Sequence, residues 1–295
     1  MAANYWESTQ KRFWHFTREE LSEMRQTLEN EDQALVQQYP LPDRRLLSIF
    51  FNQQLVKLGR RMAVRQQALA TAQVYIRRFY LKVEIRRTNP YLVVSTALYL
   101  ACKMEESPQH IRVIVSEARN IWPDLMLPEV SKVGECEFFL ISEMNCQLII
   151  HHPYRTLTDL QPILKLSPEE VALASSIIND HYLTDLPVLY PLHVIAATSI
   201  FMALTLKNGA GSSAITTANA IQAAKDASKV PSNDTTSKSK IQTLIAWLAK
   251  GEVDIQAMID CTQEIVSLYE VWEQYNDKQC KEQIARFVWA KGLDK

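Results

Sequence analysis

The charged side chains best placed for chemistry stand at the end of one apolar stretch, residues 89–106. Lys103, Glu105 and Glu106 close a run that is apolar on nearly every side, which is typical of a buried helix. The two glutamates are adjacent, so they point apart and do not converge as an acid–base pair. The three charges either solvate the helix end, where a lysine suits the helix dipole and a glutamate does not, or they bind a partner.

A further carboxylate lies where charge is unexpected. Residues 128–144 predict a helix with one apolar face, and Glu137 falls in that face between Val133 and Leu140. Removing the partner of a buried charge costs about 3–5 kcal/mol, so Glu137 requires a partner if it is buried. The sequence leaves three alternatives open: an internal salt bridge, a position at the edge of the apolar face, or a donor on another chain.

Motifs for catalysis or metal binding are missing from the sequence. It has no Gly-rich phosphate loop, no G-x-S-x-G, no H-E-x-x-H and no kinase H-R-D. His151 and His152 are adjacent and cannot share one helix face, so we expect no metal there. The five cysteines are odd in number and lack C-x-x-C spacing, which favours structural thiols in the nucleus or cytosol. We expect no catalytic residue, cofactor or metal.

Composition favours a soluble helical protein of about two domains. The chain has 295 residues, of which 47% are hydrophobic and 22% charged, and only six are glycines. The net charge of −1 gives no indication of a basic nucleic-acid-binding surface. No apolar run is long enough for a membrane span, and the first residues do not resemble a signal peptide.

The charged residues above must be positioned by a bundle of helices. Apolar spacing predicts five helices at about 43–58, 65–81, 89–106, 108–121 and 128–144, with Pro90 in the first turn of the third. Residues 4–30 predict one or two amphipathic helices rich in aromatic residues, including Trp6 and Trp14. This aromatic face must pack on its own domain or on a partner.

The second half of the sequence predicts another helical unit after a linker at 151–154. Helices are expected at about 167–182, 192–206, 241–248, 253–275 and 277–289, the first opened by a capping box from Ser167 to Glu170. Pro191 and Val194 follow Pro90 and Val93 by 101 residues (191−90), a weak internal repeat. Residues 207–240 lack large apolar side chains and predict a largely disordered insertion, with a loose helix around 214–227.

The two helical units and the motif Ala101-Cys-Lys-Met-Glu-Glu106 resemble the cyclin family, over nearly the whole chain apart from the insertion. The resemblance implies an all-α fold of two tandem five-helix cyclin boxes. It places the first box at 43–149 and the second at 150–276, flanked by an N-terminal extension (1–42) and a C-terminal helix (277–295).

The resemblance also implies a kinase-binding face. Lys103 and Glu137 match the pair that in cyclins holds the partner kinase near its C helix, which would give Glu137 an outside partner. Glu105 and Glu106 are expected to meet basic residues of the kinase. Trp6 and Trp14, in the aromatic N-terminal segment, complete the expected kinase-binding set.

The sequence also differs from cell-cycle cyclins at two pairs of positions. Those cyclins pair an Arg and an Asp where this sequence has Ser48 and Arg77, and they build a substrate-docking patch with a Trp and a Glu where it has Gln54 and Lys57. A docking groove of that kind is therefore not expected.

Short motifs such as Asn4-Tyr-Trp-Glu-Ser8 and Tyr75-Ile-Arg-Arg-Phe-Tyr80 are similar to the cyclin C subfamily, and the insertion favours a fungal member. This resemblance implies a nuclear, non-catalytic subunit that activates a cyclin-dependent kinase of the Mediator kinase module. Its partners would be that kinase, other module subunits and the RNA polymerase II holoenzyme, with no direct contact to nucleic acid or membrane. Alternatives are a cyclin of the H or T type with another kinase, or a DNA-binding initiation factor of the transcription factor IIB type.

Overall fold

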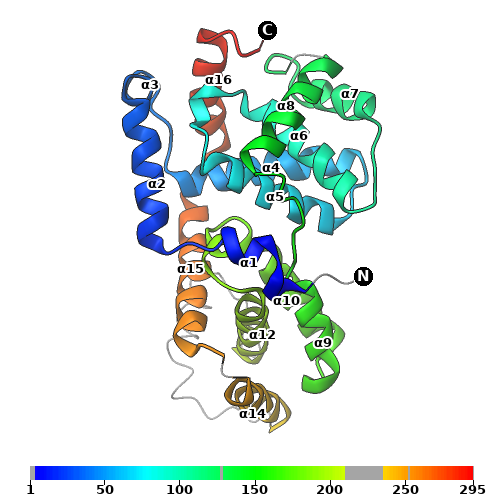
Figure 1. The fold of residues 1–295 in the computed structure, drawn as a ribbon. Helices are drawn as coiled ribbons and strands as arrows, with labels where there is room; N and C mark the ends of the chain where they lie inside the picture. The colour runs from blue at the N-terminus through cyan, green and yellow to red at the C-terminus, as the bar shows by residue number, and fades with distance from the viewer. Residues whose placement is uncertain (1–3, 127–128, 210–234, 252, 295) are drawn as a thin grey trace. The chain divides into compact units, whose positions relative to one another are not determined.

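The computed structural model describes residues 4–126, 129–209, 235–251 and 253–294, and every regular element in these ranges is a helix (Figure 1). The chain divides into two compact units. Unit 1 comprises residues 1–151 and 274–295, and unit 2 comprises residues 152–273. The C-terminal helix thus belongs to the same unit as the N-terminal extension and the first predicted box.

Unit 1 is built around α6 (Pro90–Met104), the helix predicted from residues 89–106. It contacts α4 (Arg44–Arg61), α5 (Gln66–Tyr80), α7 (Ile111–Ile121) and α8 (Val130–Glu143), which surround it in Figure 1. Most residues of α6 are buried, and Lys103 and Met104 at its C-terminal end are exposed. The all-round apolar composition of α6 therefore has the expected consequence, a helix enclosed by four others.

The start of α6 is fixed by Asn89, which is buried. Its side-chain oxygen accepts the N–H of Tyr91 at 3.0 Å, as expected of an N-cap residue. Its amide nitrogen donates to the carbonyl oxygens of Leu125 at 2.6 Å and Leu293 at 3.1 Å. One side chain therefore caps the central helix and ties it to the α7–α8 connection and to the C-terminal tail.

The N-terminal extension is helical, as the sequence predicts, and it is divided into short pieces. These are a 3-10 turn η1 (Tyr5–Glu7), α1 (Thr9–Phe13), α2 (Arg18–Glu31) and α3 (Gln33–Gln38). A capping box between Thr17 and Glu20 opens α2. Because α1 ends before this box begins, the aromatic residues from Tyr5 to Phe16 do not form one continuous face.

The C-terminal helix α16 (Asp277–Ala290) packs on α4. The Asp277 carboxylate accepts a hydrogen bond from Gln54 at 3.4 Å and lies 3.9 Å from the Lys57 ammonium group. Gln54 is buried, and its side-chain oxygen accepts the indole N–H of Trp122 at 3.0 Å. The two α4 positions that differ from the cell-cycle docking patch are thus engaged by α16 and the α7–α8 connection.

Unit 2 is organised in the same way around α12 (Leu192–Gly209), which contacts four helices. These are α9 (Tyr154–Leu164), α10 (Pro168–His181), α14 (Thr235–Lys250) and α15 (Ile255–Glu273), with the short α11 (Leu186–Leu189) between α10 and α12. The sequence did not predict α9. This helix is short and contains Pro162, which weakens the local helix signal, but Leu157, Leu160 and Leu164 are buried.

The ends of the predicted insertion are helical, so its bounds of 207 and 240 were too wide. Helix α12 continues to Gly209 and α14 begins at Thr235, while the loose helix expected at 214–227 lies outside the described residues. The buried carboxylate of Glu170 contacts both of these helices, since it receives Lys240 Nζ at 2.8 Å and lies 3.8 Å from Lys207 Nζ. The same carboxylate completes the predicted capping box with Ser167, so the start of α10 contacts both helices that flank the insertion.

Candidate functional site

The C-terminal end of α6 brings together two of the residues singled out from the sequence. Lys103 Nζ lies 2.6 Å from Glu137 Oε1 on α8, and the Lys103 side chain is 42% exposed while that of Glu137 is 12% exposed. Lys103 Nζ also lies 4.8 Å from the centre of the Tyr99 ring, a cation–π contact. Of the three alternatives for Glu137, the structure adopts the internal salt bridge. The outside donor that the resemblance suggested is not needed to pair this carboxylate.

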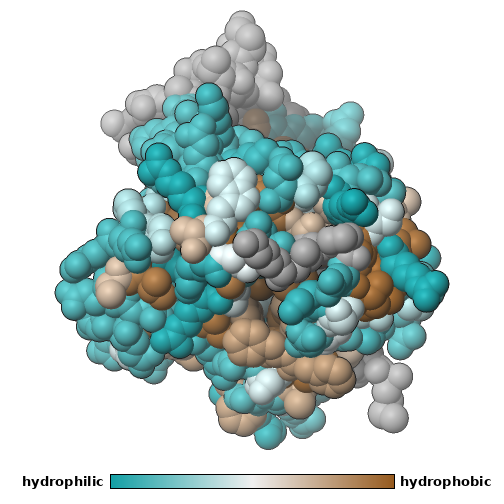
Figure 2. All heavy atoms as spheres, turned by 90° about the horizontal axis from the view of Figure 1, so that it is seen from above, coloured by the Kyte–Doolittle hydropathy of each residue, from teal (hydrophilic) through white to brown (hydrophobic). Residues whose placement is uncertain are grey.

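Exposed apolar residues follow both members of this ion pair in the sequence. Phe138, next to Glu137, is 76% exposed, and Met104, next to Lys103, is also exposed. Phe139 is exposed too, with its ring 5.1 Å from that of the buried Phe79 in an edge-on arrangement. Hydrophobic patches interrupt the hydrophilic surface in Figure 2. Phe138 and Phe139 were not among the site residues predicted from the sequence, because an aromatic residue in an apolar helix is normally expected to be buried.

The two glutamates after Lys103 have different environments. Glu105 is the C-cap residue of α6, and its carboxylate accepts hydrogen bonds from Gln67 at 2.6 Å and Thr71 at 2.5 Å, both on α5. Glu106 is exposed and has a left-handed backbone with φ 50°. Glu105 therefore fixes α5 to the end of α6, and Glu106 is the glutamate of this pair that presents its carboxylate to solvent.

The two tryptophans of the N-terminal extension differ in exposure. Trp6 is 58% exposed, whereas Trp14 is 2% exposed and belongs to the core of unit 1. The prediction that both tryptophans contact a partner does not fit the position of Trp14, which no partner can reach. Trp14 instead anchors the extension, and Trp6 remains the predicted contact residue.

The anchor depends on a buried arginine that the sequence analysis did not single out. The Arg78 guanidinium lies 4.5 Å from the centre of the Trp14 ring and donates to the carbonyl of Gln147 at 3.0 Å. The indole N–H of Trp14 donates to the side-chain oxygen of the same Gln147 at 2.6 Å. Burial lowers the pKa of Arg78 to about 9, so the side chain stays charged at neutral pH.

His15, beside this anchor, is held neutral. Burial, with the positive charges of Lys11 and Arg78, lowers the pKa of His15 to about 4. Its Nε2 lies 2.7 Å from the hydroxyl of Tyr5. The attachment of the N-terminal extension is therefore more stable when the His15 imidazole is neutral.

The ranges that the structure describes contain neither a candidate metal centre nor a candidate membrane span. In these ranges, histidine, cysteine and acidic side chains form no group of three or more that is able to hold a metal ion. None of the described helices combines the length and apolar character that crossing a membrane requires.

Comparison with known proteins identifies the family. Residues 12–149 match the family "Cyclin, N-terminal domain". The "RNA polymerase II holoenzyme cyclin-like subunit" of Aspergillus oryzae is 60% identical over 301 residues, an alignment that covers all of both chains. The chain belongs to the cyclin family. The Aspergillus fumigatus protein of the same name is 61% identical over the full length of both chains, so this cyclin groups with the fungal proteins of that name.

Solved structures agree with the fold of this cyclin. A chain in the structure of the CAK complex of Chaetomium thermophilum has a TM-score of 0.61 at 20% identity, covering 99% of this chain and 88% of that one. A chain of the yeast TFIIK complex has a TM-score of 0.60 at 18% identity, covering 88% of this chain and all of that one. The predicted all-α cyclin fold is therefore confirmed.

Proposed function

We propose that this cyclin is the regulatory, non-catalytic subunit of a nuclear cyclin-dependent kinase in the Mediator kinase module. In this role it activates a kinase that phosphorylates RNA polymerase II and transcription factors. The full-length identity to fungal proteins named as RNA polymerase II holoenzyme cyclin-like subunits supports this assignment. The family membership favours a cyclin over a DNA-binding factor of the transcription factor IIB type.

The observation that carries the proposal is the Lys103–Glu137 pair, with Lys103 exposed, together with the exposed Phe138 and Met104 that follow these residues on the same two helices. Apolar side chains beside charged groups are typical of a protein interface, where the apolar part supplies burial and the charges supply register. We propose that the kinase C helix lies against this face and exchanges hydrogen bonds with Lys103 and Glu137. Holding that helix in place completes the Lys–Glu pair that phosphoryl transfer requires in protein kinases.

Glu106 and Trp6 extend the proposed face. The exposed Glu106 is available to basic residues of the kinase, whereas the Glu105 carboxylate already accepts two hydrogen bonds from α5. Trp6 offers a large exposed aromatic ring of the type that often dominates binding free energy. In this proposal Glu105 and Trp14 act indirectly, by fixing the end of α6 and the N-terminal extension.

The test is co-purification with the Mediator-type kinase, comparing wild type with the double variant Lys103→Ala/Glu137→Ala. Losing charge pairs that become desolvated at an interface typically costs about 2–5 kcal/mol, so we expect binding to weaken at least about thirtyfold. The matched control is Lys278→Ala/Glu282→Ala, which removes an ion pair of the same residue types on α16, outside the α6–α8 face, with 3.9 Å between Nζ and Oε1. This control should bind and activate the kinase like wild type.

The outcomes separate the alternatives. Equal loss in both double variants would disprove a specific role for Lys103 and Glu137. No binding of the folded wild type to the Mediator-type kinase, with binding to the kinase of an H-type or T-type cyclin, would replace the proposed kinase. Salt-dependent DNA binding in place of any kinase binding would support the initiation-factor alternative.

A further inference from the structure

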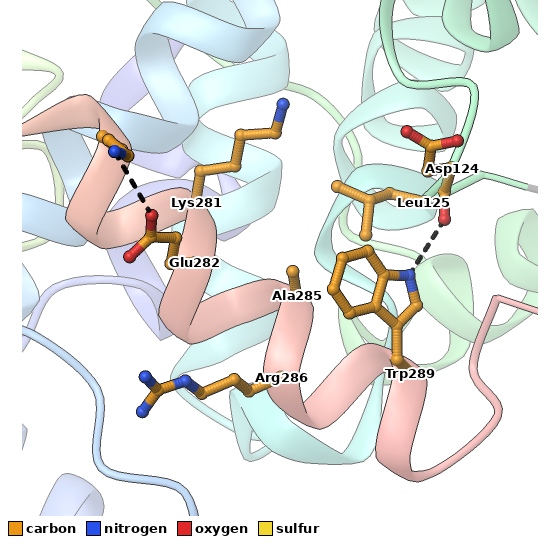
Figure 3. A pocket seen from close by; sticks show the side chains of 8 residues that line it. Asp124, Leu125, Lys281, Glu282, Ala285, Arg286 and Trp289 are labelled. Carbon is orange, nitrogen blue, oxygen red and sulfur yellow. Dashed lines mark hydrogen bonds and ion pairs between the residues drawn. The ribbon is translucent and has the colours of Figure 1, made fainter.

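A groove in unit 1 lies between α16 and the residues connecting α7 to α8 (Figure 3). Its volume is about 440 Å³. It is formed by elements other than the α6–α8 face to which we assign the kinase. A ligand of this groove therefore uses a surface other than the face that we assign to the kinase.

The floor of the groove is apolar and ends in a fixed aromatic ring. Leu125 and Ala285 are buried there, and Trp289 is 54% exposed. The indole N–H of Trp289 donates to the carbonyl of Asp124 at 3.1 Å, which holds the ring beside Leu125 (Figure 3). A ring already fixed in place loses little conformational entropy on binding, so it is a suitable anchor for an apolar side chain.

The rim of the groove carries an excess of positive charge. The groove is lined by three cationic side chains, Lys278, Lys281 and Arg286, and by the two carboxylates of Asp124 and Glu282. Lys278 Nζ lies 3.9 Å from Glu282 Oε1, one turn along α16. Neither Lys281 nor Arg286 forms an ion pair with another residue in the described ranges. Two cations beside an apolar floor are therefore available to a ligand.

We propose that this groove binds an acidic peptide segment of a protein partner, with an aromatic or aliphatic side chain placed on Trp289 and carboxylates placed at Lys281 and Arg286. Nucleic acid fits less well, because two unpaired cations neutralise few phosphates and the chain has a net charge of −1. A second copy of this groove also fits less well, since its own basic rim would repel the first.

The test uses the full chain and a fluorescein-labelled peptide of about 15 residues, in which Asp and Glu alternate with Phe and Leu, an acidic–apolar composition. We expect saturable binding by fluorescence anisotropy. The variant Lys281→Glu/Arg286→Glu should weaken binding at least about tenfold, because it replaces attraction by repulsion at both ends of the contact. The control Arg60→Glu/Arg112→Glu makes the same change of net charge at exposed residues outside the groove, and should change binding less than about twofold.

The contribution of the aromatic ring is tested separately. Trp289→Ala should weaken binding about tenfold, as expected of an interface anchor, whereas Trp289→Phe, which keeps a ring, should weaken it less. A peptide with Ser in place of Phe and Leu should bind weakly. The proposal is overturned if the serine peptide binds equally well, if the control pair loses binding as much as the groove pair, or if Trp289→Ala has no effect.

Discussion

The attachment of the N-terminal extension to unit 1 should depend on Trp14 and hardly at all on Trp6. Both tryptophans lie in the same segment, so Trp14→Ala and Trp6→Ala remove the same side chain from a buried and from an exposed position. Truncating a buried Trp to Ala typically costs about 3–5 kcal/mol. Truncating one that is more than half exposed should cost less than about 0.5 kcal/mol.

The expected loss for Trp14 has identifiable parts. The ring contributes apolar burial and the cation–π contact with Arg78, which is worth about 2 kcal/mol when desolvated. The indole N–H contributes one hydrogen bond to Gln147, worth about 1 kcal/mol. Trp14→Phe keeps the ring and loses the hydrogen bond, so its cost should be about a third of that of Trp14→Ala.

The loss should appear as local detachment of the segment. Gln10 on α1 exchanges hydrogen bonds with the backbone of His151, its Oε1 accepting at 2.7 Å, and this second contact is lost when the segment opens. Limited proteolysis by trypsin after Lys11 and Arg12 measures the open population when opening is fast relative to cleavage. A loss of about 3 kcal/mol in the free energy of opening raises the cleavage rate roughly 100-fold.

The three variants should therefore differ in cleavage rate in a defined order. Cleavage should accelerate roughly 100-fold in Trp14→Ala, roughly tenfold or less in Trp14→Phe, and less than about twofold in Trp6→Ala. Equal acceleration in Trp14→Ala and Trp6→Ala would refute the argument from burial. Acceleration in neither would show that Trp14 does not anchor the segment.

Three further predictions follow from single side chains. Asn89→Asp should lower the free energy of unfolding of unit 1 by at least about 2 kcal/mol at pH 7, measured by urea unfolding, because a carboxylate cannot donate hydrogen bonds to the two carbonyls that accept from Asn89. The control Asn276→Asp should be nearly neutral, because the Asn276 side-chain oxygen only accepts an N–H. The folded pKa of His15 is lowered, so the unfolded state binds more protons and stability falls by at most about 3 kcal/mol as the pH drops from about 6.5 to about 4. Hydrogen-exchange protection of α1 should follow this fall in wild type and stay level in His15→Gln. Glu106→Gly should raise the free energy of unfolding of unit 1 by about 1 kcal/mol, since glycine adopts a left-handed backbone without strain, and a loss of stability in denaturant titration would contradict this account.

The sequence alone determined the central element and the composition of the candidate site. Asn89, Pro90 and an all-round apolar run define α6 through interactions within a few residues, so its start and its burial were predictable. Lys103 and Glu137 were found because charges are conspicuous in apolar helices. Helix α9 was missed because Pro162 weakens a short local signal and burial of its leucines supplies the stability.

Only the tertiary structure decided which of these residues meet. Lys103 and Glu137 are 34 residues apart, and Gln54 and Asp277 are 223 apart, so each pairing depends on how distant helices pack. The same packing buries Trp14 against Arg78 and leaves Trp6 in solvent, although the two tryptophans look equivalent in an aromatic-rich segment. Whether a segment forms a helix depends on residues within one or two turns of each other. Whether a side chain meets the core, a partner or solvent depends on the surface that folding places opposite it.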